Sequence, residues 1–450
     1  MVVLAAAVAC VPARAVTYAE RVKEQVLPNG LKILLLEDHK APVAVYQIWY
    51  RVGSRNETVG HTGLSHLLEH LMFKGTDKVG PEEYSKIIQR NGGDTNAFTT
   101  QDYTTYFATI ASDRIGVVNE LEADRLAHLH FQEDSFTPER QVVMEERRLR
   151  TADNPVSALF ELINATVYTA HPYEWPTIGW MEDIRQATLR DAEQYFHTYY
   201  RPNNAVVIAV GDFDSAKLSA EIAKEFGSIP AGDAPPAVRA IEPAQQGERS
   251  VVLRREAQLP FIGIAYHVPN LRSSDAAAIE VLAEVLSGGK SARLYDELVY
   301  RRRLARDVGA DSDYTSVDPG TFTLYAQPLP GKKVAEVQKA LLDEVKKIQD
   351  KAPQARELEK ARNAIEASFV FAQDSLFYQG LLLGQYEMAG DWKLIDKYLP
   401  AIRAVTPEDV RRVAASYLTA DNRTVGVLEP LPSAPGRVPP PVMPPRGMVH

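Results

Sequence analysis

The sequence predicts an α+β fold built from two homologous domains, each a largely antiparallel β-sheet packed with helices. Two observations carry this prediction. In both halves strand-like runs precede helical runs, and an internal repeat relates the halves at a constant offset. Thr188 and Thr406 lie 218 positions apart, as do Asn204 and Asn422. Each threonine opens a helical run and each asparagine precedes an apolar strand, so we expect one architecture used twice.

The first fifteen residues predict most of a secretory signal peptide. Residues 2–11 are an apolar, alanine-rich run that is too short to span a bilayer, and Ala13-Arg14-Ala15 matches a cleavage site, although a positively charged start is missing. We expect the mature chain to begin at Val16, to be exported to a bacterial periplasm and to have no transmembrane segment. A lipoprotein anchored at Cys10 is the weaker alternative, because an alanine stands where a larger aliphatic residue is expected.

Residues 16–230 form the first predicted domain. Its opening residues alternate around a Pro28-Asn29-Gly30 turn, and this pattern predicts a hairpin over residues 26–36. Residues 43–52 are rich in β-branched and aromatic side chains and predict the next strand.

A composition change marks the boundary between the halves. Residues 231–248 are rich in proline and alanine and predict a linker. The second predicted domain covers residues 249–430 and opens with strand-like runs at 251–255 and 261–268. Residues 431–450 contain many prolines and no apolar period, so they predict a disordered tail.

The chemistry of the first half is concentrated in His66-Leu67-Leu68-Glu69-His70. On a helix His66 and His70 leave one face at a separation that a single metal ion can bridge. Glu69 lies beside them, where a carboxylate can deprotonate a zinc-bound water without being a ligand. The other helix face is apolar. The alternative is a helix whose histidines only cap or pack.

A catalytic zinc needs a third protein ligand, and a second predicted helix offers one. Thr137 predicts its N-cap and Pro138 its first residue. Glu139 and Glu146 are seven positions apart and share a face, whereas Glu145 is turned about 100° away. We expect Glu146 to be the ligand and Glu139 to orient a ligand histidine. The alternative is a solvated acidic face paired with nearby arginines, namely Arg147, Arg148 and Arg150.

These motifs resemble the inverzincin family of pitrilysin, insulinase and the mitochondrial processing peptidase. In that family the third ligand is a glutamate about 76 residues after the second histidine, and Glu146 follows His70 by 76 positions. The family's further required glutamate maps onto Glu139. The resemblance implies one Zn²⁺ per chain and a zinc-dependent endopeptidase of peptides or small unfolded proteins. Glu69 would be the general base of a zinc-activated water.

The segment between the two helices resembles a further family motif. Residues 92–106 are similar to the family's Gly-x-x-Asn-Ala-x-Thr segment, which pairs with extended substrate along an edge strand. Threonine, tyrosine and phenylalanine in this segment are independently strand-like. The resemblance therefore implies peptide binding at four residues: Asn96, Ala97, Phe98 and Thr99.

The second half lacks the metal motif. Residues 280–284 align with the histidine helix but contain no histidine. The family's second-half arginine and tyrosine, which reach the substrate, fall on Val299 and Arg306, so that pair is missing. The resemblance implies that a homologous metal-free subunit supplies it in a heterodimer. The alternative is replacement by a local arginine, either Arg306 itself or one of Arg301, Arg302 and Arg303.

Charge and composition limit the function classes. The chain has 450 residues and a formal charge of −9 without a basic cluster, which argues against nucleic acid as a partner. A second function class remains open, a non-catalytic structural or assembly subunit that keeps the peptidase fold. Glu69 favours the enzyme, because a scaffold has no need of a base beside the metal.

Overall fold

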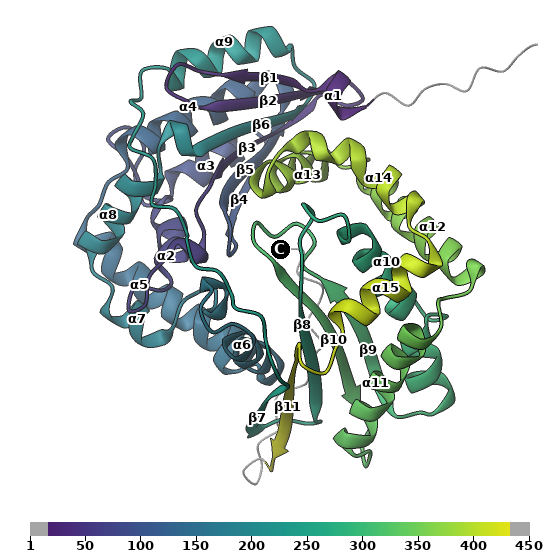
Figure 1. Ribbon diagram of the computed structural model, residues 1–450. Helices are drawn as coiled ribbons and strands as arrows, with labels where there is room; N and C mark the ends of the chain where they lie inside the picture. Colours follow the sequence, from purple (N-terminus) through teal and green to yellow (C-terminus); the bar gives the residue numbers. More distant parts are fainter. Residues whose placement is uncertain (1–16, 433–450) are drawn as a thin grey trace, which may run out of the picture.

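Two β-sheets, one in each half of the chain, organise the molecule (Figure 1). The computed structural model describes residues 17–432, so the predicted signal peptide (1–15) and the tail beyond residue 432 lie outside the described residues. The first sheet has the order β1-β2-β6-β3-β5-β4. Its strands are β1 (Lys23–Val26), β2 (Lys32–Glu37), β3 (Val43–Tyr50), β4 (Asp94–Thr99), β5 (Thr104–Ala111) and β6 (Ala205–Gly211).

The second sheet repeats this topology without a counterpart of β1. Its order is β7-β11-β8-β10-β9. Only β2–β6 and β7–β11 are parallel among the paired strands, so the predicted fold class of two largely antiparallel sheets is confirmed. The strands are β7 (Arg249–Glu256), β8 (Phe261–Val268), β9 (Ala305–Ser312), β10 (Gly320–Pro328) and β11 (Arg423–Leu431).

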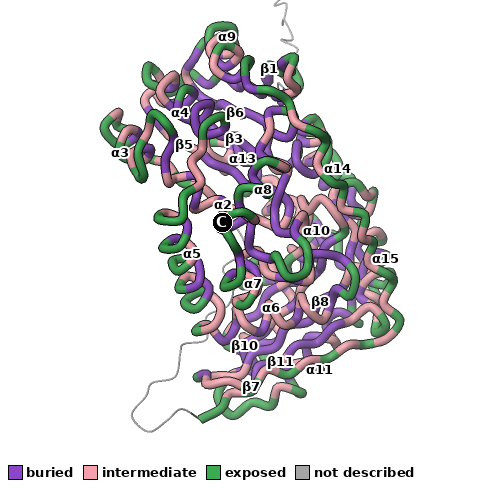
Figure 2. Tube along the Cα trace, turned by 90° about the vertical axis from the view of Figure 1, so that its left-hand side faces the viewer, coloured by how far each residue is buried: buried purple, intermediate pink, exposed green. Residues whose placement is uncertain are grey.

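Helices cover both sheets. Figure 2 shows buried strands such as β3 and β6 inside outer helices such as α9, whose outward residues are exposed. The helices that lie in the first half are α1 (Tyr18–Arg21), α2 (Leu64–Leu71), α3 (Glu83–Arg90), α4 (Ile115–His128), α5 (Glu133–Arg147), α6 (Pro155–Val167), α7 (Met181–Gln186), α8 (Leu189–Tyr199) and α9 (Ser215–Phe226). Those in the second are α10 (Ala276–Ser287), α11 (Val334–Asp350), α12 (Ala355–Ala372), α13 (Leu376–Ala389), α14 (Ile395–Ala404) and α15 (Pro407–Tyr417).

The internal repeat is visible at the level of single hydrogen bonds. The side chains of Thr188 and Thr406 cap α8 and α15 by accepting the N–H three residues on. At the other end of these helices the amides of Asn204 and Asn422 donate to the carbonyls of Tyr199 (2.8 Å) and Tyr417 (2.7 Å). The same residues therefore start and stop the same helix in both halves, and each helix leads into the strand that forms the parallel pair.

Each half lends one helix to the other sheet (Figure 1). Helix α13 packs on β3 and β6 of the first sheet, and α6 packs on β7, β8 and β11 of the second. Both contacts need a glycine. A Cβ on Gly384 would lie 2.2 Å from Trp49, and a Cβ on Gly426 would lie 2.3 Å from Ile163. The face of each sheet that is turned away from its own helices is thus covered by a helix from the opposite half.

A polar junction also joins the halves, at the turn between β4 and β5. Asp102 in this turn accepts hydrogen bonds from the hydroxyl of Tyr173 (2.6 Å) and from the N–H of Val317 in the second half (3.0 Å). The neighbouring Asp318 pairs with Arg55 and lies 3.1 Å from Nε2 of His171. These bonds fix the end of the edge strand β4 against the second half.

The core of the first half contains a buried ion pair on α4. Arg125 and Glu122 are 2% and 0% exposed and are joined by bonds of 2.7 Å (Nε to Oε2) and 2.6 Å (Nη2 to Oε1). The hydroxyl of Tyr84 donates to the same carboxylate at 2.5 Å, and the guanidinium lies 4.2 Å from the ring centroid of Tyr106. The pair therefore connects α4, α3 and β5 in a site from which water is excluded.

The structure corrects two predicted boundaries. Helix α5 begins at Glu133, so the predicted start at Thr137 and Pro138 is wrong. The N–H groups of Ser135 and Phe136 bond to the carbonyl of Gln132, and the acidic first turn suits the positive end of the helix dipole. Pro138 therefore lies inside the helix, where its missing N–H removes one backbone hydrogen bond. Leu431 is the last residue of β11, so the strand extends one residue into the predicted tail of residues 431–450.

Candidate metal centre

Helix α2 carries the histidines, and its start is fixed by two features. Gly63 precedes the helix at φ +90°, a conformation that glycine adopts without strain. The buried carboxylate of Glu57 accepts the N–H groups of Gly63 and Ser65, each at 2.7 Å. Glu57 is not marked by the zinc motif itself, although an acidic residue shortly before a predicted helix start is a usable signal. The leucines of α2 are buried, so the histidines project from the opposite face.

The three predicted ligand side chains come together. One ligand atom from each of His66, His70 and Glu146 lies within 4.8 Å of the others. Oε2 of Glu146 is 3.3 Å from Nε2 of His70 and 3.7 Å from Nε2 of His66. Two ligands bound to one zinc ion at about 2.1 Å and a tetrahedral angle lie about 3.4 Å apart. The spacing and the two-histidine, one-glutamate donor set therefore fit a zinc ion.

Glu139, which the sequence predicted to orient a ligand histidine, contacts His70. Its Oε1 lies 2.9 Å from Nδ1 of His70, which turns Nε2 of that ring toward Glu146. Its Oε2 pairs with Lys74 at 2.6 Å. Lys74 was not anticipated. Lys74 follows His70 by four residues, which on a continuous helix would put both side chains on one face. Because α2 ends at Leu71, this spacing does not predict the contact of Lys74 with Glu139.

Glu69 faces the edge of the first sheet. The hydroxyl of Thr99 donates to Oε2 of Glu69 at 2.5 Å, so the last residue of β4 holds this carboxylate. The other predicted substrate residues lie on the same strand, where Asn96 is exposed and Ala97 and Phe98 are half-buried. β4 is the outermost strand of its sheet among the described residues, so one of its backbone edges is unpaired by any strand there.

Burial and neighbouring charges set the ionisation of these groups. Burial, followed by the charge of His70, lowers the pKa of His66 to about 3. Burial also lowers the pKa of His70, but hydrogen bonds to Glu139 and Glu146 outweigh it and raise this pKa to about 9.

The carboxylates respond in different directions. Burial raises the pKa of Glu146, but the hydrogen bond to His70 and the charges around it outweigh burial and bring the pKa to about 2. Burial raises the pKa of Glu69, and the bond from Thr99 opposes part of that rise. Glu146 therefore favours the charged form that ligates metal, and Glu69 more readily holds a proton.

The second half has no equivalent cluster in the described part of the chain. Glu280 and Glu284 stand on α10 where the histidines stand on α2, and Glu280 accepts a hydrogen bond from Tyr398 at 2.5 Å. Val299 is half-buried in a π-helical turn (Tyr295–Arg301). It packs against a cluster of buried apolar side chains that includes the core of the second half. Arg306 is exposed on the edge strand β9.

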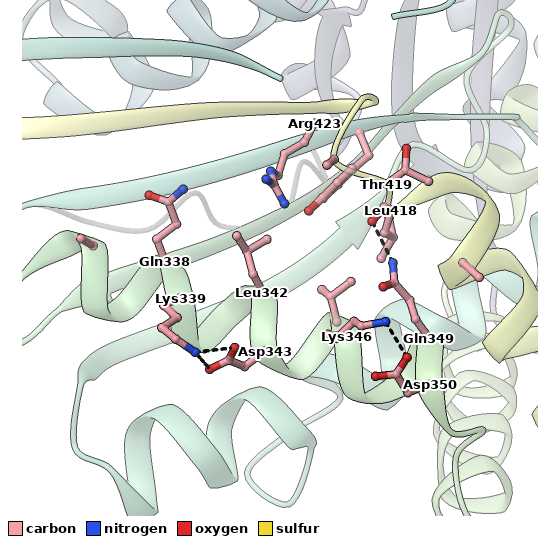
Figure 3. Close-up of a pocket in the computed structure, with 15 residues that line it drawn as sticks. Gln338, Lys339, Leu342, Asp343, Lys346, Gln349, Asp350, Leu418, Thr419 and Arg423 are labelled. Carbon is pink, nitrogen blue, oxygen red and sulfur yellow. Dashed lines mark hydrogen bonds and ion pairs between the residues drawn. The ribbon is translucent and has the colours of Figure 1, made fainter. Parts of the chain in front are cut away.

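A separate hollow in the second half lies between α11 and the connection from α15 to β11 (Figure 3). Its cavity volume is about 880 Å³. Lys339–Asp343 and Lys346–Asp350 pair along its rim, at 2.8 and 2.5 Å. It brings together no three metal-ligating side chains among residues 17–432. The candidate chemistry therefore lies at the centre in the first half.

Two family models match the chain. The model described as "Insulinase (Peptidase family M16)" matches residues 32–179, and the model described as "Peptidase M16 inactive domain" matches residues 186–365. The first match contains all the side chains of the candidate centre, whereas the second covers most of the half that lacks them.

Curated relatives and solved structures agree with these matches. Zinc protease PqqE of Helicobacter pylori is 34% identical over 418 residues, covering 92% of this chain and 94% of that protein. The uncharacterized zinc protease YmxG of Bacillus subtilis is 25% identical, covering 89% and 96%. A crystal structure of a protease from Helicobacter pylori gives a TM-score of 0.88 at 33% identity, covering 91% and 100%.

A more distant structure shares the fold alone. The periplasmic protease PqqL from Escherichia coli gives a TM-score of 0.77 at 18% identity, with 91% of this chain and 48% of that chain covered.

Proposed function

Because the chain belongs to peptidase family M16, the insulinase- and pitrilysin-like zinc proteases, we propose that it is a zinc-dependent endopeptidase of peptides or small unfolded proteins. The observation that carries this proposal is the convergence of His66, His70 and Glu146 with Glu69 beside them. Relatives named zinc proteases support it.

We assign the binding of one zinc ion per chain to His66, His70 and Glu146. Bound zinc supplies Lewis acidity, which polarises a carbonyl and lowers the pKa of water towards about 7. Glu139 supports this set by accepting the N–H at Nδ1 of His70, which leaves Nε2 free to ligate.

Glu69 serves as the general base. Thr99 holds its Oε2, so Oε1 is the oxygen that takes the proton of the attacking water. The water oxygen adds to the carbonyl carbon of the peptide bond. As the carbon–nitrogen bond breaks, Glu69 returns the proton to the leaving amine, which balances the hydrolysis. Burial, which favours the protonated carboxyl, suits this exchange.

We propose that an extended peptide pairs with β4 along Asn96, Ala97, Phe98 and Thr99. The unpaired backbone edge of an outer strand can accept a peptide as an additional strand. The hydrogen bond from Thr99 to Glu69 supports this path, because it joins the end of the strand to the proposed base. A peptide on β4 would therefore pass beside the candidate centre.

A homologous metal-free subunit is the proposed source of the arginine and tyrosine that are absent at Val299 and Arg306. Val299 is apolar and packed in the second core, so it offers no replacement. The alternative is that a local arginine replaces the missing pair. Two of the four arginines are already in ion pairs, Arg301 with Asp296 and Arg302 with Glu336. Arg303 and Arg306 are both exposed.

Mixing experiments test the partner. We expect the purified chain alone to hydrolyse an unstructured peptide slowly, and addition of a homologous chain without the zinc motif to raise kcat about 10²- to 10³-fold, the typical effect of one oxyanion donor. A matched addition of the same homologue carrying alanines at its arginine and tyrosine should give no such rise. Full activity of the chain alone would remove the heterodimer.

Zinc content tests the enzyme itself. Purified chain is expected to carry one zinc ion, measured by elemental analysis, and to lose hydrolysis when a chelator removes it. Activity should return when zinc is added back, because the ligand set belongs to the chain. His61→Gln, a change in an exposed histidine outside the cluster, is the control. Hydrolysis that persists in chain shown to be free of metal would contradict the proposal.

The second candidate is a non-catalytic assembly subunit with the same fold. The observations that favour it are the missing second-half pair and the match to an inactive-domain model over residues 186–365, which include part of the second half. Substitution of Glu69 separates the two functions, as argued in the Discussion.

We propose a periplasmic location. The name of PqqL, a periplasmic protease of the same fold, is compatible with it, and the predicted signal peptide (1–15) supports it. Within residues 17–432 no helix combines the length and the apolar character needed to cross a membrane.

A further inference from the structure

The three candidate ligands differ in what holds them in place. His70 is held by Glu139, which is in turn paired with Lys74. Nδ1 of His66 is buried and has no hydrogen-bond partner among the described residues, so no second carboxylate orients that ring as Glu139 orients the ring of His70. Glu146 has a partner of its own, because Nη1 of Arg150 lies 2.9 Å from its Oε1.

The two carboxylate oxygens of Glu146 have different neighbours. Oε1 forms an ion pair with the guanidinium, and Oε2 lies 3.3 Å from Nε2 of His70 and 3.7 Å from Nε2 of His66. A glutamate without such a partner can turn and offer both oxygens to a metal ion. A bidentate glutamate would fill coordination space that a catalytic zinc keeps open for water and substrate.

The local backbone places Arg150 for this contact. Helix α5 ends at Arg147 and continues as a π-helical turn (Arg148–Ala152), closed by a bond from the N–H of Asp153 to the carbonyl of Arg148 at 2.7 Å. Such single turns often occur at functional sites. Arg147 anchors the turn through two bonds of 2.9 Å to Glu161 on α6.

We propose that Arg150 is a positioning residue that holds Glu146 as a one-oxygen ligand, with Oε2 facing the metal and Oε1 turned away. The inference rests on the proposed zinc site. The side chain of Arg150 is 68% exposed, so its ion pair adds little to folding, and its effect concentrates on the metal centre. Partners that orient metal ligands typically change metal affinity or activity about 10- to 100-fold.

The turn provides a matched control. Arg148 pairs with Glu145 on the same stretch of chain, and both side chains are exposed, at 49% and 59%. Arg148→Gln therefore removes one positive charge and one exposed ion pair close to the site without touching a ligand. Arg150→Gln removes the same charge together with the ion pair to Glu146, and Arg150→Lys keeps the charge but loses the planar guanidinium.

The experiment measures zinc dissociation constants by competition with a chromophoric chelator, and the visible absorption of the Co²⁺-loaded proteins. We expect Arg150→Gln to weaken zinc binding about 10- to 100-fold and to change the cobalt spectrum. Arg150→Lys should fall between it and wild type, and Arg148→Gln should match wild type. A spectral change without a matching change in thermal unfolding of the metal-free proteins is a signature that a merely structural role would not give.

Two outcomes overturn the inference. Wild-type affinity and spectrum in Arg150→Gln would show that Glu146 needs no such partner. Equal losses in Arg150→Gln and Arg148→Gln would show a general charge effect. Failure of the wild-type chain to bind zinc is a different result, because it removes the proposed metal centre itself.

Discussion

Glu69→Gln is expected to lower kcat/KM for peptide hydrolysis by about 10²- to 10⁴-fold, the usual contribution of a general base, while zinc content stays at one ion per chain. Glutamine keeps the shape and can still accept the hydrogen bond from Thr99, but it cannot take a proton. Because Glu69 is not one of the three clustered ligands, metal binding should survive. Initial rates with a quenched fluorescent peptide and elemental analysis of the same samples measure both quantities.

Glu145→Gln is the matched control for this change. Glu145 lies next to Glu146, pairs with Arg148 and is exposed, so its loss should leave kcat/KM within about twofold. If wild type and Glu69→Gln both bind zinc and are equally inactive, with the metal-free partner present, the chain is an assembly subunit. Loss of zinc from Glu69→Gln would show instead that Glu69 supports the metal.

Glu122→Leu is expected to destabilise the folded chain by about 3–5 kcal/mol, the cost of leaving a buried charge without its partner. Arg125 is 2% exposed and its carboxylate partner is fully buried, so no water reaches the guanidinium to replace the lost bonds. The hydroxyl of Tyr84 loses its acceptor at the same time. Urea unfolding followed by circular dichroism, with wild type as reference, measures the change.

The double substitution Glu122→Leu with Arg125→Met tests the reason for this loss. Replacing both charges by apolar side chains of similar size is often neutral or stabilising, so the double variant should recover most of the stability. A single Glu122→Leu variant within about 1 kcal/mol of wild type would show that the pair is not a buried ion pair in solution.

Local spacing made the three clustered side chains and the repeat predictable. His66, Glu69 and His70 lie within five consecutive residues of one helix, and the seven-residue interval from Glu139 to Glu146 stays on one helix face even though the predicted helix start was wrong. The 218-residue repeat was also predictable from local sequence, because Asn204 and Asn422 each cap the end of the helix immediately before them.

Contacts between distant segments could not be predicted in this way. The sequence around Thr99 does not predict that its hydroxyl donates to Glu69, because this hydrogen bond depends on how the fold brings β4 and α2 together. Charged residues at helical spacing usually indicate a solvated face, so Glu122 and Arg125 gave no sign of their burial.

The packing of α6 and α13 on the sheet of the opposite half could not be predicted from the sequence either. An apolar face shows that a helix is covered, but it does not show by which sheet. In α13 ten residues from Gln379 to Ala389 are buried. The helix therefore has no single apolar face from which the side that contacts the sheet could be predicted.

The exchanged helices α6 and α13 determine how this chain can move. Separation of the two halves would leave each sheet without the helix that covers one of its faces, so we expect neither half to fold stably alone. A hinge between the halves would expose both sealed faces at once, at a cost set by many buried apolar side chains. We therefore expect the chain to resist opening between its two halves.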